Sequence, residues 1–277
     1  MIDMFFEMLS YPFMVRAFVV GILVSLCSAL LGVSLVLKRY SMIGDGLSHV
    51  GFGALAAAAA LNAAPLAVAI PVVVVSAILL LRVSGSSKIK GDAAIALIST
   101  SALAVGIMII SMTTGMNTDV YNYMFGSILA MSSQDVEMSV LLSAAVLILY
   151  IFFYHKIFAI TFDETFAQAT GVRAGLYNTL IAVLTAVTIV LGMRMMGTLL
   201  ISSLIIFPAL TSMRVCRTFY SVTVSSAVVS VVCFCVGITV SYFFATPAGA
   251  SVVIVNLLML GIYAIVGILN NQCFYPK

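Results

Sequence analysis

Asp45 and His49 are the two side chains in this sequence whose types and spacing point most directly to chemistry. They lie four residues apart within the stretch SMIGDGLSHVGFG (41–53). On a helix this spacing places both side chains on one face, one turn apart. A carboxylate and an imidazole are suitable ligands for a divalent transition metal. The spacing alone leaves a second interpretation open, in which the two residues form a structural hydrogen-bonded or ion pair, for instance with Lys38 or Arg39.

The rest of the chain carries no short motif that is typical of an enzyme. No Walker A, HExxH or GxSxG pattern occurs. The five cysteines are odd in number and lie mostly in apolar runs, so we interpret them as packing residues rather than a disulfide framework. Any uphill transport by this chain therefore draws its energy from a gradient or from another subunit.

The composition requires elements that lie in a membrane. The chain has 277 residues, of which 64% are hydrophobic and 8% are charged, whereas soluble domains have roughly 45–50% apolar and about 25% charged residues. This excludes soluble enzymes, nucleic-acid-binding proteins and secreted disulfide scaffolds. Because one crossing takes roughly 20 apolar residues, the chain has enough for about nine.

Short polar breaks divide the chain into apolar segments of spanning length, so the sequence predicts an all-α, polytopic bundle. Ten of the twelve Lys and Arg residues fall in alternate connections, which predicts nine spans with the N-terminus outside and the C-terminus inside. If the second segment, which holds Asp45 and His49, is re-entrant, eight spans result and the N-terminus lies inside. The segments are 13–37, 41–61, 65–83, 92–113, 134–154, 175–192, 196–213, 219–243 and 249–269.

The stretch 157–174 differs from the apolar segments because it is mildly amphipathic. Phe162 and Phe166 lie on roughly one side of a predicted helix, and Gly171 is a suitable C-cap. A short cytoplasmic helix of this kind lies on the membrane interface or docks into a groove of a partner.

Five stretches, in this order and spacing, resemble the permease subunits of the metal-type ABC importers, which carry zinc, manganese and ferrous iron. The resemblance covers about residues 13–269. The chain departs from the family pattern at Ala96, where glycine is usual, and at Glu164, which replaces the proline of an Asp-Pro-Glu sequence. The stretches are KRYSMIGDGLSHVG (38–51), KGDAAIA (90–96), FGSIL (125–129), TFDETFAQATGV (161–172), and MGTLLISSLIIFPA (196–209) followed by ATPAGASVVI (245–254).

The resemblance implies a single permease domain over 1–277, a bundle of eight or nine transmembrane helices of the type II ABC importer kind. It implies a homodimer in the bacterial cytoplasmic membrane, surrounded by lipid, with no catalytic site, no bound cofactor and no nucleic-acid partner. ATP would be hydrolysed on a partner ATPase subunit, and a metal-binding solute-binding lipoprotein would deliver the metal.

The resemblance also implies roles for individual residues. Asp45 and His49 match the family's metal-contacting pair, and a homodimer would bring two such pairs towards one axis. We expect zinc as the cargo, with manganese close behind and ferrous iron next. The stretch 161–173 matches the coupling helix that docks on the ATPase, and its matching residues are Asp163, Glu164, Phe166, Ala167 and Gly171. Asp163 is expected to cap this helix in the absence of the proline.

Three other classes of protein compete with this interpretation. The first is a secondary metal or proton transporter, or a channel, that uses Asp45 and His49 without any ATPase. The second is a permease for cobalamin or iron-siderophores, whose Arg-Asn-Pro signature after the second span is absent. The third is an intramembrane enzyme, which would need more polar residues within the spans.

Overall fold

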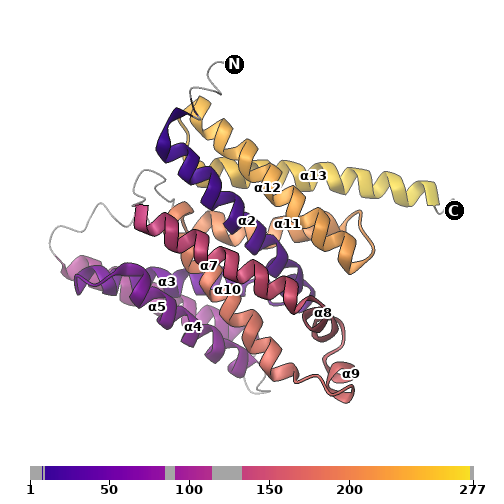
Figure 1. Cartoon of the computed structure of the whole chain (residues 1–277), viewed down its shortest axis with the longest axis horizontal. Helices are drawn as coiled ribbons and strands as arrows, with labels where there is room; N and C mark the ends of the chain where they lie inside the picture. The colour runs from indigo at the N-terminus through magenta and orange to yellow at the C-terminus, as the bar shows by residue number, and fades with distance from the viewer. Residues whose placement is uncertain (1–7, 9, 85–90, 114–132, 275–277) are drawn as a thin grey trace.

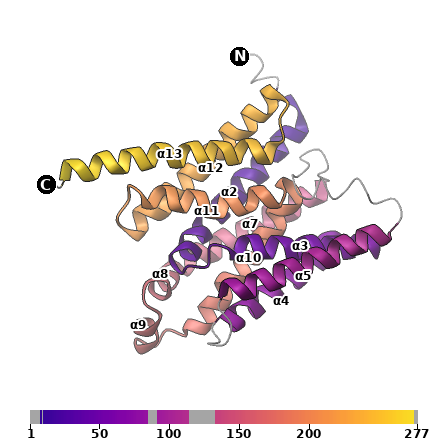
Figure 2. The same cartoon turned by 180° about the vertical axis from the view of Figure 1, so that it is seen from behind.

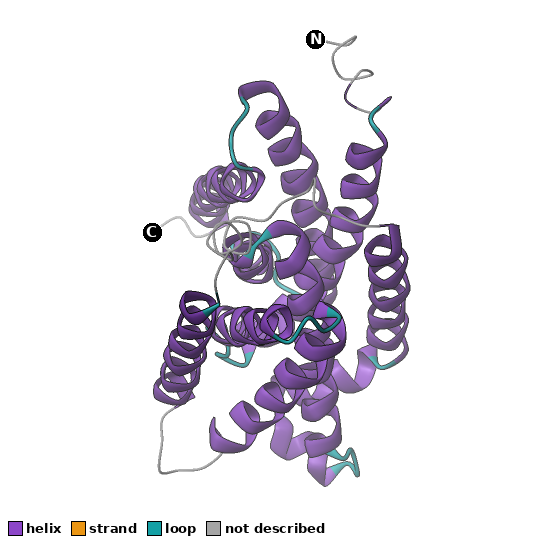
Figure 3. Cartoon of the chain, turned by 90° about the vertical axis from the view of Figure 1, so that its left-hand side faces the viewer, coloured by secondary structure: helices purple, strands orange, loops and turns teal. Residues whose placement is uncertain are grey.

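The computed structural model describes residues 8, 10–84, 91–113 and 133–274. These ranges contain helices joined by short turns and no strand, which confirms the all-α prediction (Figure 3). FGSIL (125–129) lies outside the described residues. The helices are α2 (Pro12–Leu37), α3 (Ile43–Ala60), α4 (Pro65–Ser84), α5 (Gly91–Met112), α7 (Ser133–Phe152), α8 (Tyr154–Phe162), α9 (Glu164–Ala169), α10 (Ala174–Met196), α11 (Thr198–Met213), α12 (Phe219–Phe244) and α13 (Ala248–Phe274).

Each of the nine predicted apolar segments corresponds to one of these helices. Seven of them, in the described ranges, are long and apolar enough to cross a membrane. The other two are α11, which has 16 residues, and α3, which has 18 residues and contains Asp45 and His49. Helices α8 and α9 lie between α7 and α10 in the chain, and both are much shorter than the helices around them (Figure 1).

Helix α3 is one continuous helix rather than a re-entrant hairpin. Its 18 residues extend about 27 Å at 1.5 Å per residue. Arg82, near the end of α4, lines the same cavity as Lys38, which follows α2. Helix α3 therefore runs away from the end at which α2 stops, and α4 returns to it. This arrangement agrees with the alternating directions of the nine-segment prediction.

Basic residues mark one end of the bundle, which we call the basic end and define by Lys38, Arg82, Arg173 and Arg214. Helices α8 and α9 lie at this end (Figures 1 and 2). At the opposite end, Arg194 of α10 forms an ion pair with Asp135 of α7, with 2.9 Å between Nη2 and Oδ2. Lys38, Arg82, Arg173 and Arg214, which the topology prediction assigned to one side, thus lie at one end of the described part of the chain.

Helix α3 lies in the centre of one half of the molecule, where it packs against α4, α5, α10 and α11. Its contact with α5 is close because Gly53 faces the α5 backbone. A Cβ atom at Gly53 would lie 2.7 Å from the carbonyl oxygen of Ala102. Small residues let membrane helices approach one another in this way. Because four helices pack against α3, an exposed polar side chain on this helix is a candidate for a functional role.

Candidate functional site

Asp45 and His49 face each other on α3, as their spacing predicts. The distance between His49 Nε2 and Asp45 Oδ2 is 3.7 Å. The His49 side chain is 24% exposed and the Asp45 side chain is 46% exposed. A carboxylate and an imidazole thus remain accessible on a helix that is otherwise mostly buried.

The two residues begin a line of accessible positions along α3. From Ile43 to Ala58, every residue of this helix is buried except Asp45, His49, Gly53 and Ala57. These four follow one another at intervals of four, so they lie on one face of the helix. This partly exposed face of α3 therefore presents two potential metal ligands, followed by Gly53, which packs against α5, and Ala57. We call it the open line.

Ser202 of α11 is a polar neighbour of this pair that the sequence analysis did not identify. Its hydroxyl lies 3.4 Å from Asp45 Oδ1, 3.2 Å from the hydroxyl of Ser48 and 3.0 Å from the carbonyl oxygen of Thr198. Ser48 in turn donates a hydrogen bond to the carbonyl oxygen of Gly44. These contacts join α3 to α11 at the level of Asp45. The only signal in the sequence was the Ser-Ser pair within the 196–209 stretch.

The distance between the two side chains suits a shared metal ion. Ligand atoms about 2.0–2.1 Å from a tetrahedral zinc ion lie about 3.3 Å from each other, and the observed separation is 3.7 Å. A small rotamer adjustment would bring both atoms into range. The described part of the chain contains no group of three or more His, Cys, Asp or Glu residues that could hold a metal. One chain therefore supplies two ligands from this pair.

In the second interpretation, Asp45 and His49 form a structural ion pair with a residue such as Lys38. The structure places Lys38 elsewhere. Its Nζ atom lies 3.4 Å from Glu164 Oε2, at the start of α9. It also donates a hydrogen bond to Asn178 Oδ1 of α10. Burial lowers the pKa of Lys38, and the neighbouring Glu164 carboxylate partly offsets this effect. The ion pair of Lys38 belongs to the basic end and not to the metal-ligand pair.

The predicted single helix over 161–173 is wrong in its bounds, because the segment breaks at Asp163. Helix α8 ends at Phe162, and α9 covers only Glu164–Ala169. Asp163 has extended backbone angles, φ −147° and ψ 98°, and its Oδ1 accepts a hydrogen bond from the backbone N–H of Phe166. The side chain that was expected to cap a helix does so, but the cap starts a new short helix instead of continuing α8.

Helix α9 ends at Ala169 with Thr170 as its C-cap, and Gly171, the predicted C-cap, lies one position further along, where the chain turns. This residue has φ +85°, a left-handed conformation that favours glycine. The backbone N–H of Val172 donates to the carbonyl oxygen of Ala167, and that of Gly171 donates to Gln168, which is the Schellman arrangement. Ala167 is fully buried, whereas Phe166 is 66% exposed. The short helix thus holds one small residue inward and presents one aromatic side chain outward.

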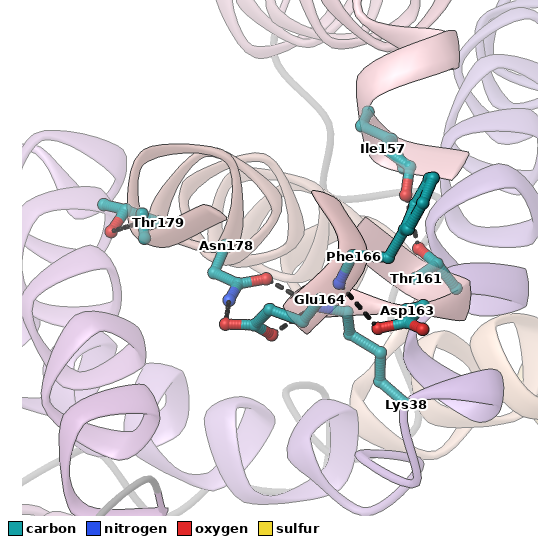
Figure 4. A network of polar contacts seen from close by, with 9 residues as sticks. Lys38, Ile157, Thr161, Asp163, Glu164, Phe166, Asn178 and Thr179 are labelled. Carbon is teal, nitrogen blue, oxygen red and sulfur yellow. Dashed lines mark hydrogen bonds and ion pairs between the residues drawn. The ribbon is translucent and has the colours of Figure 1, made fainter. Parts of the chain in front are cut away.

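Three polar side chains connect α9 to the bundle, and we call them the Glu164 cluster: Lys38, Glu164 and Asn178 (Figure 4). Glu164 Oε1 accepts a hydrogen bond from Asn178 Nδ2 at 3.1 Å, while Oε2 faces Lys38. The cluster borders a cavity of about 680 Å³ that Arg82 also lines. No local pattern in the sequence indicates the Lys38–Glu164 contact, because 126 residues separate the two positions.

Comparison with known proteins agrees with this architecture. The family described as the ABC 3 transport family matches residues 10–267. The chain belongs to the ABC 3 transport family. It is therefore a multi-pass membrane permease, a transport component and not a catalyst.

Relatives of this permease are named for metal transport. A probable metal transport system membrane protein of Thermotoga maritima is 32% identical, over 92% of this chain and 90% of its own. The manganese transport system membrane protein MntC of Halalkalibacterium halodurans is 28% identical, over 91% and 86%. The high-affinity zinc uptake system membrane protein ZnuB of Haemophilus influenzae is 30% identical, over 86% and 91%.

A solved structure has the same fold. PsaBC from Streptococcus pneumoniae, in complex with Fab, contains a chain with 30% sequence identity and a TM-score of 0.85. The match covers 95% of this permease and 95% of that chain. The helix arrangement described above is thus that of an ABC transporter permease, and this permease belongs to the metal-transport branch of such proteins.

Proposed function

We propose that this permease imports a divalent transition metal, zinc foremost and manganese or ferrous iron next, past Asp45 and His49. The observation that carries the proposal is the open line on α3. A helix that packs against four others leaves a carboxylate and an imidazole partly exposed on one face. Ionisable residues within membrane segments mark ion pathways by default.

The chemistry of the pair fits a metal cargo that must be released again. Asp45 supplies negative charge against the divalent ion, and neutral His49 supplies a nitrogen ligand. A transported ion must be released, so the site must hold it more loosely than a structural zinc site does. A second copy of the permease facing the same line would contribute another carboxylate and imidazole, and the two negative charges would offset much of the cost of a divalent ion in the membrane. We therefore propose a homodimer.

The energy source in this proposal is a partner ATPase that docks on α9 at the basic end. Two features support α9 as the docking element: its position beyond the long helices and the exposed Phe166 (Figure 1). The capping residues Asp163 and Gly171 hold its shape. A metal-binding solute-binding lipoprotein would deliver the ion at the opposite end. The basic end would then lie in the cytoplasm, as the distribution of Lys and Arg predicts.

The test is metal uptake by proteoliposomes that contain the permease with its ATPase and binding protein. We expect ATP-dependent uptake, and side-by-side measurement of Zn²⁺, Mn²⁺ and Fe²⁺ identifies the cargo. Asp45→Asn keeps the shape of the side chain but removes its charge, and His49→Ala removes the nitrogen ligand. We expect both variants to lower uptake per folded complex at least ten-fold, without loss of thermal stability.

Glu137→Gln is the matched control, because it removes one negative charge from an exposed position on α7. We expect it to leave uptake unchanged. Wild-type uptake per complex in both Asp45→Asn and His49→Ala would eliminate the pair as the pathway. Uptake that persists without ATP or the ATPase would identify a secondary transporter or channel instead.

A further inference from the structure

Glu164 contacts two segments that lie far from it in the sequence. Lys38 is the C-cap of α2, Glu164 is the first residue of α9, and Asn178 belongs to the first part of α10. Each of the three side chains contacts both others, since Lys38 Nζ also donates to Asn178 Oδ1 (Figure 4). The cluster is therefore a closed triangle that joins α2, α9 and α10.

Burial indicates which member of the triangle is the fixed one. The Lys38 side chain is 11% exposed, whereas that of Glu164 is 45% exposed. A buried cation needs a partner of opposite charge, because an unpaired buried charge is strongly unfavourable. Lys38 is thus a largely buried cation at the end of α2, and Glu164 of α9 is its partner of opposite charge.

Helix α9 depends on such contacts for its position. With six residues it is too short to be stable by itself. The Asp163 cap and the Gly171 turn shape the helix but do not connect it to the long helices. Ala167 provides apolar burial, and Glu164 provides the polar attachment.

The residue that Glu164 contacts lies directly before α3. Lys38 begins a turn in which Arg39 adopts φ +63° and the N–H of Tyr40 donates to the carbonyl oxygen of Leu35 at 2.8 Å. These hydrogen bonds define the path of the chain from α2 into α3. Asp45 follows Lys38 by seven residues, in the first turn of α3.

We infer that Glu164 is a positioning residue that fastens α9 to the α2–α3 turn and to α10, and so transmits displacement of α9 to the helix that carries Asp45 and His49. The fastening follows from the geometry of the cluster. The transmission rests on the proposed function, in which an ATPase docks on α9. The two parts are tested by separate measurements.

Hydrogen–deuterium exchange on the full-length permease in nanodiscs tests the fastening without any partner. Glu164→Gln keeps the size of the side chain and removes the charge that faces Lys38. We expect amide exchange over 164–172 to become about two- to five-fold faster, the range that a partly exposed ion pair supports. Glu137→Gln on α7 serves as the control and leaves this segment unchanged.

Charge reversal provides the second arm of this experiment. Lys38→Glu alone places two carboxylates together and is expected to speed exchange further. The double variant with Lys38→Glu and Glu164→Lys restores opposite charges and is expected to slow it again. Wild-type exchange in both Glu164→Gln and Lys38→Glu would overturn the inference.

Metal uptake per ATP hydrolysed, in the complex with the ATPase, tests the transmission. We expect Glu164→Gln to lower this ratio about two- to five-fold, with normal assembly and thermal stability. A merely structural role would lower the yield of complex and leave the ratio unchanged, which overturns transmission. If the wild-type complex takes up no metal, the proposed function and the transmission both fail, while the exchange data still decide the fastening.

Discussion

Phe166 of α9 offers a direct measure of whether this helix docks on a partner. It is 66% exposed at the basic end of the bundle. Because an aromatic side chain buries about 150–250 Å² when it is fully covered, roughly 130 Å² remains available for burial in a partner. At about 25 cal/mol per Å² this area corresponds to at most about 3 kcal/mol of docking free energy.

Phe166→Asp removes this apolar area and requires a carboxylate to be desolvated in its place. A loss of about 3 kcal/mol weakens binding of the ATPase by roughly 100-fold. The assay is the dissociation constant of the purified ATPase subunit for the permease in nanodiscs, measured by biolayer interferometry. We expect the thermal stability of the permease itself to stay unchanged, because the position is exposed and the backbone N–H remains capped by Asp163.

Phe244→Asp is the matched control for this experiment. Phe244 is 73% exposed and ends α12 at the opposite end of the bundle. The same chemical change there is expected to leave ATPase binding intact. A dissociation constant for Phe166→Asp within about two-fold of wild type would refute the assignment of α9 as the docking element.

Three further predictions concern the elements that shape the two sites. Asp163→Ala deletes the cap of α9 and is expected to destabilise that helix by about 1 kcal/mol, seen as faster local amide exchange that Asp163→Asn does not produce. Gly171→Ala forces φ +85° on a residue with a Cβ, which we expect to weaken the same helix by about 1 kcal/mol, although no neighbouring atom lies within 4 Å. Gly53→Ala places a Cβ 2.7 Å from the carbonyl oxygen of Ala102 and is expected to lower the free energy of unfolding by about 1–3 kcal/mol, seen as a lower thermal midpoint, whereas Gly261→Ala, which meets no atom within 4 Å, should leave both unchanged.

The features that the sequence predicted correctly depend on local spacing or on the membrane as solvent. Lipid requires long apolar segments, so the predicted 13–37 and the observed Pro12–Leu37 agree almost to the residue. Asp45 and His49 share a face because helical geometry places every fourth residue there. Gly171 closes α9 because few other residues adopt its backbone conformation. Each of these signals lies within a few residues of its effect.

The break at Asp163 shows where a local signal was present but incomplete. The amphipathic pattern of 161–173 is compatible with one helix, and the same Asp163 is compatible with a cap inside it. Tertiary contacts around Phe162 and Glu164 decide between one helix and two. In the structure the segment forms two helices, α8 and α9. The pattern predicted the residues at the helix ends but not the division of the segment.

Contacts between distant residues were decided by the tertiary structure alone. Ser202 approaches Asp45 across 157 positions, and Lys38 meets Glu164 across 126. The open line on α3 is of the same kind, because only the packing of α4, α5, α10 and α11 determines which face of a helix stays uncovered. The spacing of residues in the sequence determines which side chains share a helix face. Which other helix covers that face depends on how all the helices pack together, because the fold minimises the free energy of the whole bundle.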